Sequence, residues 1–418
     1  MSSKQVKASY VVRPETAVLT RGFDPHLSVG SARPAVFRSS TYVFSSPEAA
    51  ERAFAVALGR SKPAEGESVD LIYSRLSHPN AEIFEDQVVP LERGAQAAGV
   101  FNSGLAAIST VLLTFCRPGS TLIQTAPLYG GTQHLIHQLL EPLGVQVTPV
   151  PAGDAAAMAR AVGEAENPAM VFMETPANPT LRMSDIAAAA QAAHQRDPEI
   201  LVVVDNTFMG PTFQHPLELG ADLVVYSATK FLSGSSDMLA GVVLGRDPAR
   251  ISQLLGTRAI LGNILQPDEC WMLDQRLPTV SLRMNRQSKN AQRIADGLLA
   301  HEKIARLIYP TYFEDPEQIR IRDAQCRYPG SIVSFELRGG KQAAFDFLRA
   351  VRIAHNAVSL GGVETLTCHP ATTTHSEMSA EERERFGVSE ALVRISVGIE
   401  DWRDLLRDFR AALDQVGT

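Results

Sequence analysis

A lysine between an apolar strand and a Gly/Ser-rich loop is the first group in this chain that could do covalent chemistry. Residues 222–238 read D-L-V-V-Y-S-A-T-K-F-L-S-G-S-S-D-M, and the lysine is Lys230. A lone lysine is normally solvated, but a desolvated lysine has a lowered pKa and can form an imine with a carbonyl group. Ser227 and Thr229 stand beside it and could donate hydrogen bonds to a phosphate.

An acid at the end of an earlier apolar run is the second such group. Asp205 ends the predicted strand in V-V-V-D-N-T-F, and ligands of open α/β sheets bind at the carboxyl ends of strands. Taken alone, Asp205 fits a turn-capping acid at least as well. Together with Lys230 it suits pyridoxal 5′-phosphate (PLP), because the pyridinium nitrogen of PLP needs a carboxylate partner.

Three further segments offer groups for an anion or a flat ring. Ser103 in F-N-S-G-L-A-A-I starts a predicted helix, and its turn either presents free N–H groups to an anion or simply caps the helix. Tyr129 in P-L-Y-G-G-T either stacks on a ring or packs in a turn. Tyr73 and Arg75 in I-Y-S-R-L face one way if the segment is extended, and then grip a phosphate; the alternative is a solvated loop pair.

A last candidate is an arginine inside an apolar strand. Arg394 lies in L-V-R-I-S-V-G, and a buried arginine needs an anionic partner. The carboxylate of an amino-acid substrate would serve, and a structural ion pair is the open alternative.

The elements that must position these groups follow from hydrophobic patterning. Short apolar runs alternate with Ala-rich helical stretches between about residues 70 and 270, which predicts a mainly parallel sheet covered on both faces. Residues 271–295 predict a long helix interrupted near Pro278, and S-I-V-S-F-E-L (331–337) predicts a half-exposed strand. We expect an irregular arm over 1–66, a large cofactor-binding domain over 67–270 and a smaller C-terminal α/β domain over 271–418.

Composition excludes several other classes. The chain has 418 residues, 45% of them apolar, and a formal charge of -7 without a basic run, so nucleic acid is not an expected partner. No apolar stretch is long enough for a membrane span, and the first ten residues lack the apolar core of a signal peptide, so we expect a cytoplasmic protein. The four cysteines are far apart, without zinc spacing, and predict reduced thiols and no metal site.

The order of the motifs resembles one family, the PLP-dependent enzymes of cysteine and methionine metabolism. This family includes cystathionine γ-synthases and γ-lyases, methionine γ-lyases and O-acylhomoserine sulfhydrylases. The resemblance runs from about Tyr73 to Trp402, and the ordered set of short matches is specific. The matching segments are Y-S-R-L, S-G-L-A-A-I, L-Y-G-G-T, E-T-P-A-N-P-T, V-D-N-T-F, S-A-T-K-F, S-L-G-G-V-E-T-L, H-P-A-T-T-T-H and V-R-I-S-V-G-I-E.

The resemblance implies an aspartate-aminotransferase-like fold of type I and a homotetramer built from tight dimers with shared active sites. It implies that Lys230 is the Schiff-base lysine, Asp205 the pyridinium partner and Tyr129 the ring-stacking residue. The remaining matches are the phosphate binders Gly104, Leu105, Ser227 and Thr229, with Ser103 preceding them; Tyr73 and Arg75, which reach a neighbouring subunit's phosphate site; Asn178 near the phenolic oxygen; and Ser359 and Arg394, which bind the substrate carboxylate.

The chain departs from the family pattern at four places that bear on specificity. Methionine γ-lyases have Cys where this chain has Gly131, as cystathionine γ-lyases do, and Lys-Asp where it has Arg258-Ala259. Most members have His or Gln where it has Ser235. Cystathionine enzymes have Glu where this chain has Val358, as methionine γ-lyases do. Arg258 is either a cation near the leaving group or a surface residue.

These features predict an enzyme acting at Cγ of a small amino-acid substrate. The main hypothesis is γ-elimination of the methionine γ-lyase type, which gives a 2-oxo acid, ammonia and a thiol. The alternatives within the family are γ-replacement, as in sulfhydrylases or cystathionine γ-synthases, and cystathionine γ-lyase activity. A transaminase or decarboxylase of the same fold type and a catalytically silent binding protein are the alternatives outside it.

Overall fold

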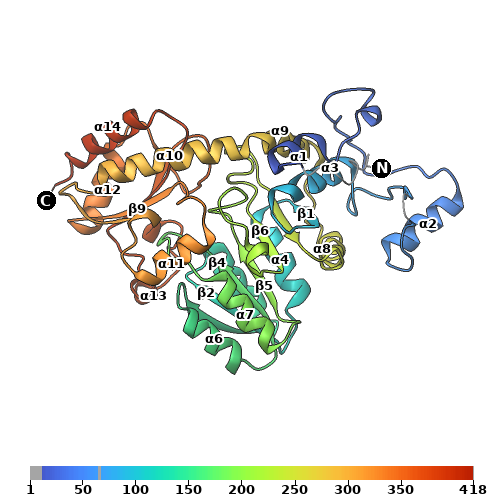
Figure 1. The fold of residues 1–418 in the computed structure, drawn as a ribbon, viewed down its shortest axis with the longest axis horizontal. Helices are drawn as coiled ribbons and strands as arrows, with labels where there is room; N and C mark the ends of the chain where they lie inside the picture. Colours follow the sequence, from blue (N-terminus) through green and yellow to red (C-terminus); the bar gives the residue numbers. More distant parts are fainter. Residues whose placement is uncertain (1–11, 65–66, 418) are drawn as a thin grey trace.

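The computed structural model describes residues 12–64 and 67–417. Two sheets organise this part of the chain, and the long helix α10 (Val280–Leu298) connects the region of the larger sheet to the smaller sheet (Figure 1). No helix among these residues is both long and apolar enough to cross a membrane.

The larger sheet has seven strands in the order β1-β7-β6-β5-β4-β2-β3. Strand β7 runs antiparallel to both of its neighbours, and the other pairs are parallel, which confirms the prediction of a mainly parallel sheet. The strands are β1 (Ala97–Phe101), β2 (Thr121–Ala126), β3 (Gln146–Pro151), β4 (Pro168–Glu174), β5 (Leu201–Asp205), β6 (Leu223–Tyr226) and β7 (Gly241–Gly245).

Helices cover both faces of this sheet, which is why its central strands are apolar throughout. Val202 and Val204 of β5 pack in one core with α6 (Ala155–Glu164) and α7 (Ile186–Arg196). Leu201 and Val203 point to the other face and pack in a second core with α4 (Gly104–Phe115) and α8 (Pro248–Leu261).

The smaller sheet has the order β10-β11-β12-β9-β8. Its strands are β8 (Ile304–Ile308), β9 (Ile332–Leu337), β10 (His355–Asn356), β11 (Leu366–Cys368) and β12 (Leu392–Ser396). Helices α12 (Gly340–Ala350) and α14 (Trp402–Leu413) pack on it together with α10. The predicted interruption near Pro278 is confirmed, because a 3-10 turn over Leu277–Thr279 separates α9 (Pro267–Arg276) from α10.

The expectation of a half-exposed strand at 331–337 is wrong. Val333 and Phe335 face the core formed with α12 and α14, but Ile332 belongs to the core of the large sheet. Ser334 also faces that way, and its hydroxyl donates to the carbonyl of Pro179. The second face of β9 is therefore covered by the other half of the molecule rather than by solvent.

The arm is also more regular than expected. It contains α1 (Pro14–Thr20) and α2 (Pro47–Ala57), and α2 projects away from the body of the chain (Figure 1). The side chain of Ser46 caps α2, and Pro47 fills its first turn. Serine and proline are common in loops, but here they mark the start of a helix. Residues 1–11 and 65–66 of the predicted arm lie outside the described residues. The other helices are α3 (Pro79–Val88), α5 (Gly130–Leu135), α11 (Pro316–Gln325) and α13 (Ala380–Arg385).

Candidate active site

A pocket at the carboxyl edge of the large sheet collects most of the predicted site residues. The parallel strands β4, β5 and β6 end on this edge, and the start of α4 and residues from the C-terminal part of the chain complete the wall. The predicted residues that line the pocket are Ser103, Gly104, Leu105, Tyr129, Asn178, Asp205, Ser227, Thr229, Lys230, Val358 and Arg394.

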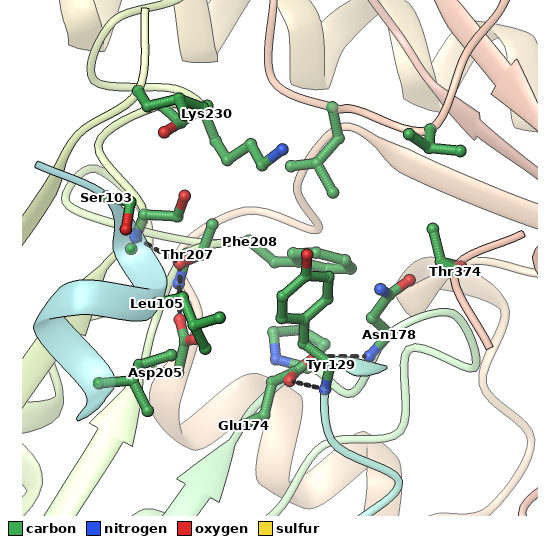
Figure 2. A pocket seen from close by; sticks show the side chains of 18 of the residues that line it. Ser103, Leu105, Tyr129, Glu174, Asn178, Asp205, Thr207, Phe208, Lys230 and Thr374 are labelled. Carbon is green, nitrogen blue, oxygen red and sulfur yellow. Dashed lines mark hydrogen bonds between the residues drawn. The ribbon is translucent and has the colours of Figure 1, made fainter. Parts of the chain in front are cut away.

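Lys230 extends its amine into this pocket (Figure 2). A turn after β6 fixes its backbone, because the Lys230 N–H donates to the carbonyl of Ser227. The preceding Thr229 donates to the carbonyl of Ala240, and its hydroxyl accepts from the N–H of Ala240. Its Nζ donates to Ser359 Oγ at 2.9 Å. Burial, and second the cationic Arg394, lowers the pKa of the amine to about 8. A weakly basic, desolvated amine is suited to imine formation.

Asp205 lies at the end of β5, with one carboxylate oxygen bound and one available. Its Oδ1 accepts from the backbone N–H of Thr207 at 3.0 Å and from the Thr207 hydroxyl at 2.6 Å. This is the turn-capping arrangement that the sequence left open. No donor from the described residues reaches Oδ2, and the pocket lies beside this residue. Burial raises the pKa of Asp205, so a cationic N–H donor in the pocket would stabilise its ionised form.

The start of α4 and the turn after β6 form one wall of the pocket. The Ser103 side chain caps α4 by accepting from the N–H of Ala106, so the helix-cap interpretation holds, yet Ser103 also lines the pocket. A Cβ on Gly104 would lie 2.8 Å from Ser227 Oγ, and only glycine permits this approach. The first N–H groups of a helix have no intrahelical partner and favour an anion such as a phosphate.

Tyr129 stands at the start of α5 with its ring over the middle of the pocket (Figure 2). The glycines that follow it are required by close contacts. A Cβ on Gly130 would lie 2.6 Å from the carbonyl oxygen of Thr374. A Cβ on Gly131 would lie 2.6 Å from Cε1 of Tyr129, so any side chain there would displace the ring.

Arg394 in β12 is buried and points at the pocket without a carboxylate partner. Its guanidinium donates to Asn178 Oδ1 at 3.0 Å and to the carbonyls of Val358 and Ser359 at 2.9 and 3.0 Å. Its Nε has no hydrogen-bond partner. No carboxylate of the described chain lies within ion-pair distance of Arg394, so the alternative of a structural ion pair is wrong. A buried cation with a free donor favours an anionic ligand.

Tyr73 and Arg75 do not line the pocket of their own chain. The chain turns after Tyr73, which forms an isolated bridge with Thr41, so the segment is not extended and the alternative of a loop pair holds. The Arg75 guanidinium lies 5.7 Å from the Tyr73 ring centroid and donates to the carbonyl of Ala259 at 2.9 Å. The two side chains nevertheless form one cationic, aromatic pair on the surface.

Arg258 is neither a cation near the leaving group nor a surface residue, the two alternatives that the sequence left open. It is 2% exposed and lies outside the pocket. Its guanidinium pairs with Glu85 and bonds to the carbonyl of Val100, each at 2.7 Å. Glu85 lies in α3 and Val100 in β1, and only the fold brings them near Arg258. The sequence therefore could not indicate these contacts.

The structure adds lining residues that the sequence analysis missed: Ile108, Glu174, Pro176, Thr207, Phe208, Leu239, Leu360 and Thr374. Glu174 ends β4 as Asp205 ends β5, and the two are paired in register on adjacent strands. The rule that singled out Asp205 would have found Glu174 as well. Burial, and second the neighbouring Asp205, raises the pKa of Glu174 well above its usual range. Thr374 comes from a distant segment, which gave no local signal.

The donor set fits PLP. Asp205 offers a free carboxylate oxygen, Lys230 a desolvated amine, Tyr129 a flat face and the α4 start a cradle that a Cβ on Gly104 would fill. These groups lie around one pocket, so a single aromatic aldehyde with a phosphate could meet all of them. The arrangement therefore matches the shape and charge pattern of the cofactor that the sequence predicted.

Comparisons with known proteins agree with this geometry. The chain is 39% identical to an L-methionine gamma-lyase of Pseudomonas deceptionensis, over 95% of this chain and 96% of that one. It is 34% identical to an O-succinylhomoserine sulfhydrylase of Pseudomonas aeruginosa, over 92% and 91% of the two chains. A cystathionine gamma synthase from Xanthomonas oryzae pv. oryzae, solved in complex with cystathionine, superposes with a TM-score of 0.88 at 32% identity and covers 97% of this chain and 99% of that one.

These neighbours share the type I PLP fold with the present chain. A family model described as Cys/Met metabolism PLP-dependent enzyme matches residues 15–414, nearly the whole chain. The motifs, the fold and the pocket thus lead to one assignment: the chain belongs to the family of PLP-dependent enzymes of cysteine and methionine metabolism.

Proposed function

We propose that this enzyme acts at Cγ of a sulfur amino acid or homoserine derivative, chiefly by γ-elimination to a 2-oxo acid, ammonia and a thiol. The similarity to proteins named L-methionine gamma-lyase supports this reaction. The observation that carries the choice is the charge of the pocket. Its lining carboxylates, within the described chain, are Glu174 and Asp205, and the position beside Ser359 holds the apolar Val358. Nothing there pairs with the distal ammonium of cystathionine.

In this proposal each polar group of the pocket has one task. Arg394 binds the substrate carboxylate through its guanidinium, and Ser359 keeps the Lys230 amine near the reacting carbons. Lys230 removes the proton from Cα and moves protons at Cβ. Tyr129 would cover one face of the PLP ring, and it assists proton transfer to the leaving group. Bound PLP supplies the electron sink for this chemistry.

The phosphate and the pyridinium nitrogen have their own groups in the proposal. The α4 start with Gly104 and Leu105 would hold the phosphate together with Ser227 and Thr229. Asp205 would accept the pyridinium N–H and keep that nitrogen protonated. Asn178 would lie near the phenolic oxygen, and its side chain bonds to Arg394, so it would connect the cofactor site with the carboxylate site.

A second candidate is γ-replacement, in which a thiol takes the place of an acyl leaving group. The similarity to an O-succinylhomoserine sulfhydrylase supports it. Val358 is equally compatible with this reaction, because the acyloxy leaving group of an acylhomoserine carries no ammonium that would need a carboxylate partner. Elimination and replacement therefore differ in the second substrate rather than in the residues that hold the first.

We also propose that the active enzyme is a homotetramer of tight dimers in the cytoplasm. Tyr73 and Arg75 support a shared site, because they lie outside the pocket as an exposed pair of one aromatic ring and one cation. The proposed division is an arm over 1–66, a PLP-binding domain over 67–270 and a small domain over 271–418. The two sheets and the connecting helix α10 are compatible with that division.

A substrate panel tests the proposed reaction. The purified enzyme with PLP is assayed with L-methionine, L-cystathionine and O-acetylhomoserine, the last with and without a thiol. We expect a higher kcat/KM for methionine or the acylhomoserine than for cystathionine. A strong preference for cystathionine would refute the proposed specificity, and formation of a thioether product would select γ-replacement.

A further inference from the structure

The buried carboxylate of Glu174 ties together two segments that approach the pocket from different directions. Its Oε2 accepts from the backbone N–H of Tyr129 at 2.6 Å, and its Oε1 accepts from the backbone N–H of Asn178 at 3.0 Å. Figure 2 shows both bonds converging on this one side chain. Glu174 is 6% exposed, and its own N–H donates to Thr125 Oγ1, so its backbone is fixed as well.

The two held residues serve different parts of the site. The ring of Tyr129 stands over the pocket, whereas Asn178 accepts from the Arg394 guanidinium with its side-chain oxygen. Tyr129 begins α5, Asn178 follows β4, and Arg394 belongs to the smaller sheet. The Glu174 carboxylate therefore anchors both Tyr129, whose ring stands over the pocket, and Asn178, which bonds to the Arg394 guanidinium.

We propose that Glu174 is a positioning residue that sets Tyr129 and Asn178 together, and through Asn178 the guanidinium of Arg394. The inference rests on the proposed roles of Tyr129 and Arg394 in binding the cofactor and the substrate. Both carboxyl oxygens of Glu174 accept from backbone N–H groups, so its task is geometry: it couples the cofactor site to the carboxylate site.

An amide cannot replace this carboxylate, whatever charge Glu174 carries. Each carboxyl oxygen keeps a lone pair for an N–H donor in the ionised form and in the protonated form. The Glu174→Gln side chain has one oxygen and one NH₂ group, and the NH₂ group cannot accept. The variant must therefore release either Tyr129 or Asn178 while it keeps the size of the side chain.

The test compares E174Q with a matched control, E92Q. Glu92 is also buried, and its carboxylate accepts from the Tyr226 hydroxyl at 2.5 Å, but it does not line the pocket. The dissociation constant of PLP is measured by titrating each apoenzyme, the KM of the best panel substrate is measured at saturating PLP, and the Tm of each apoenzyme is recorded. We expect E174Q to raise the PLP dissociation constant or the KM about tenfold, as loss of one buried hydrogen bond would.

The control separates positioning from general stability. We expect E92Q to lower the Tm while the PLP dissociation constant and the KM stay within about twofold of the wild type, since its polar contacts lie outside the pocket. If E174Q does not fold, E174D replaces it, because a shorter carboxylate cannot span both N–H groups. Wild-type binding constants in E174Q or E174D, or equal losses in E92Q, would overturn the proposal. The PLP titration needs no turnover, so it stands even if the proposed reaction is wrong.

Discussion

The lowered pKa of Lys230 gives a quantitative prediction about how the apoenzyme captures PLP. Only the free-base amine attacks an aldehyde, and burial with the nearby Arg394 lowers the pKa from 10.5 to about 8. At pH 8 about half of the Lys230 amine is then free base, against roughly 0.3% for an amine with an unshifted pKa. The pocket thus raises the reactive fraction at pH 8 by about 150-fold.

The rate of PLP capture by the apoenzyme, followed by the absorbance of the bound cofactor between pH 6 and 10.5, measures this effect. We expect the rate to rise about tenfold per pH unit up to about pH 8 and then to level off. Arg394→Met removes the second cause of the shift and keeps the first, so the plateau should move to higher pH but remain below that of a solvated amine. The substrate carboxylate is not involved, because no substrate is present.

A simple amine measured with PLP over the same pH range corrects for the protonation of PLP itself, and Lys230→Ala corrects for binding without an imine. The reasoning is refuted if the corrected rate continues to rise to pH 10, since the amine would then behave as a solvated lysine. An unchanged plateau in Arg394→Met would refute the part assigned to that cation.

Three further predictions concern the proposed roles. Asp205→Asn should lower kcat at saturating PLP at least about 100-fold, with a smaller loss of PLP affinity, since one charge-assisted contact is worth about 1.5–3 kcal/mol; an unchanged kcat would contradict the role. Val358→Glu should shift the kcat/KM ratio toward cystathionine by about tenfold, or about 1.4 kcal/mol, and no shift would remove Val358 from the specificity argument. Mixing Arg75→Ala with Lys230→Ala subunits should restore activity through hybrid sites, and no recovery despite subunit exchange would mean that the site is not shared.

The sequence alone determined the parts of this protein that depend on local pattern. The apolar runs at 97–101, 121–125 and 201–205 became strands, and 104–115 became helix α4, because continuous apolar segments bounded by polar turns have few other stable forms. Strand ends also located the site. Asp205 was found because parallel strands bring their carboxyl ends to one edge.

Only the tertiary structure decided which groups meet across distant segments. Arg258 pairs with Glu85, and Arg394 bonds to Asn178, over sequence separations that no local pattern encodes. The same holds for β9, whose second face packs against the core of the larger sheet rather than being exposed.

The arm and the pocket lining show the same division. An irregular arm was expected over residues 1–66, although Ser46 and Pro47 start helix α2, and neighbouring residues do not distinguish a loop from a helix start. Glu174 had the pattern of a strand-end acid, but its importance comes from two N–H groups that the fold brings to it. The sequence thus determined which residues can do chemistry, and the tertiary structure decided which of them are held together, because burial and hydrogen-bond partners arise only when distant segments pack.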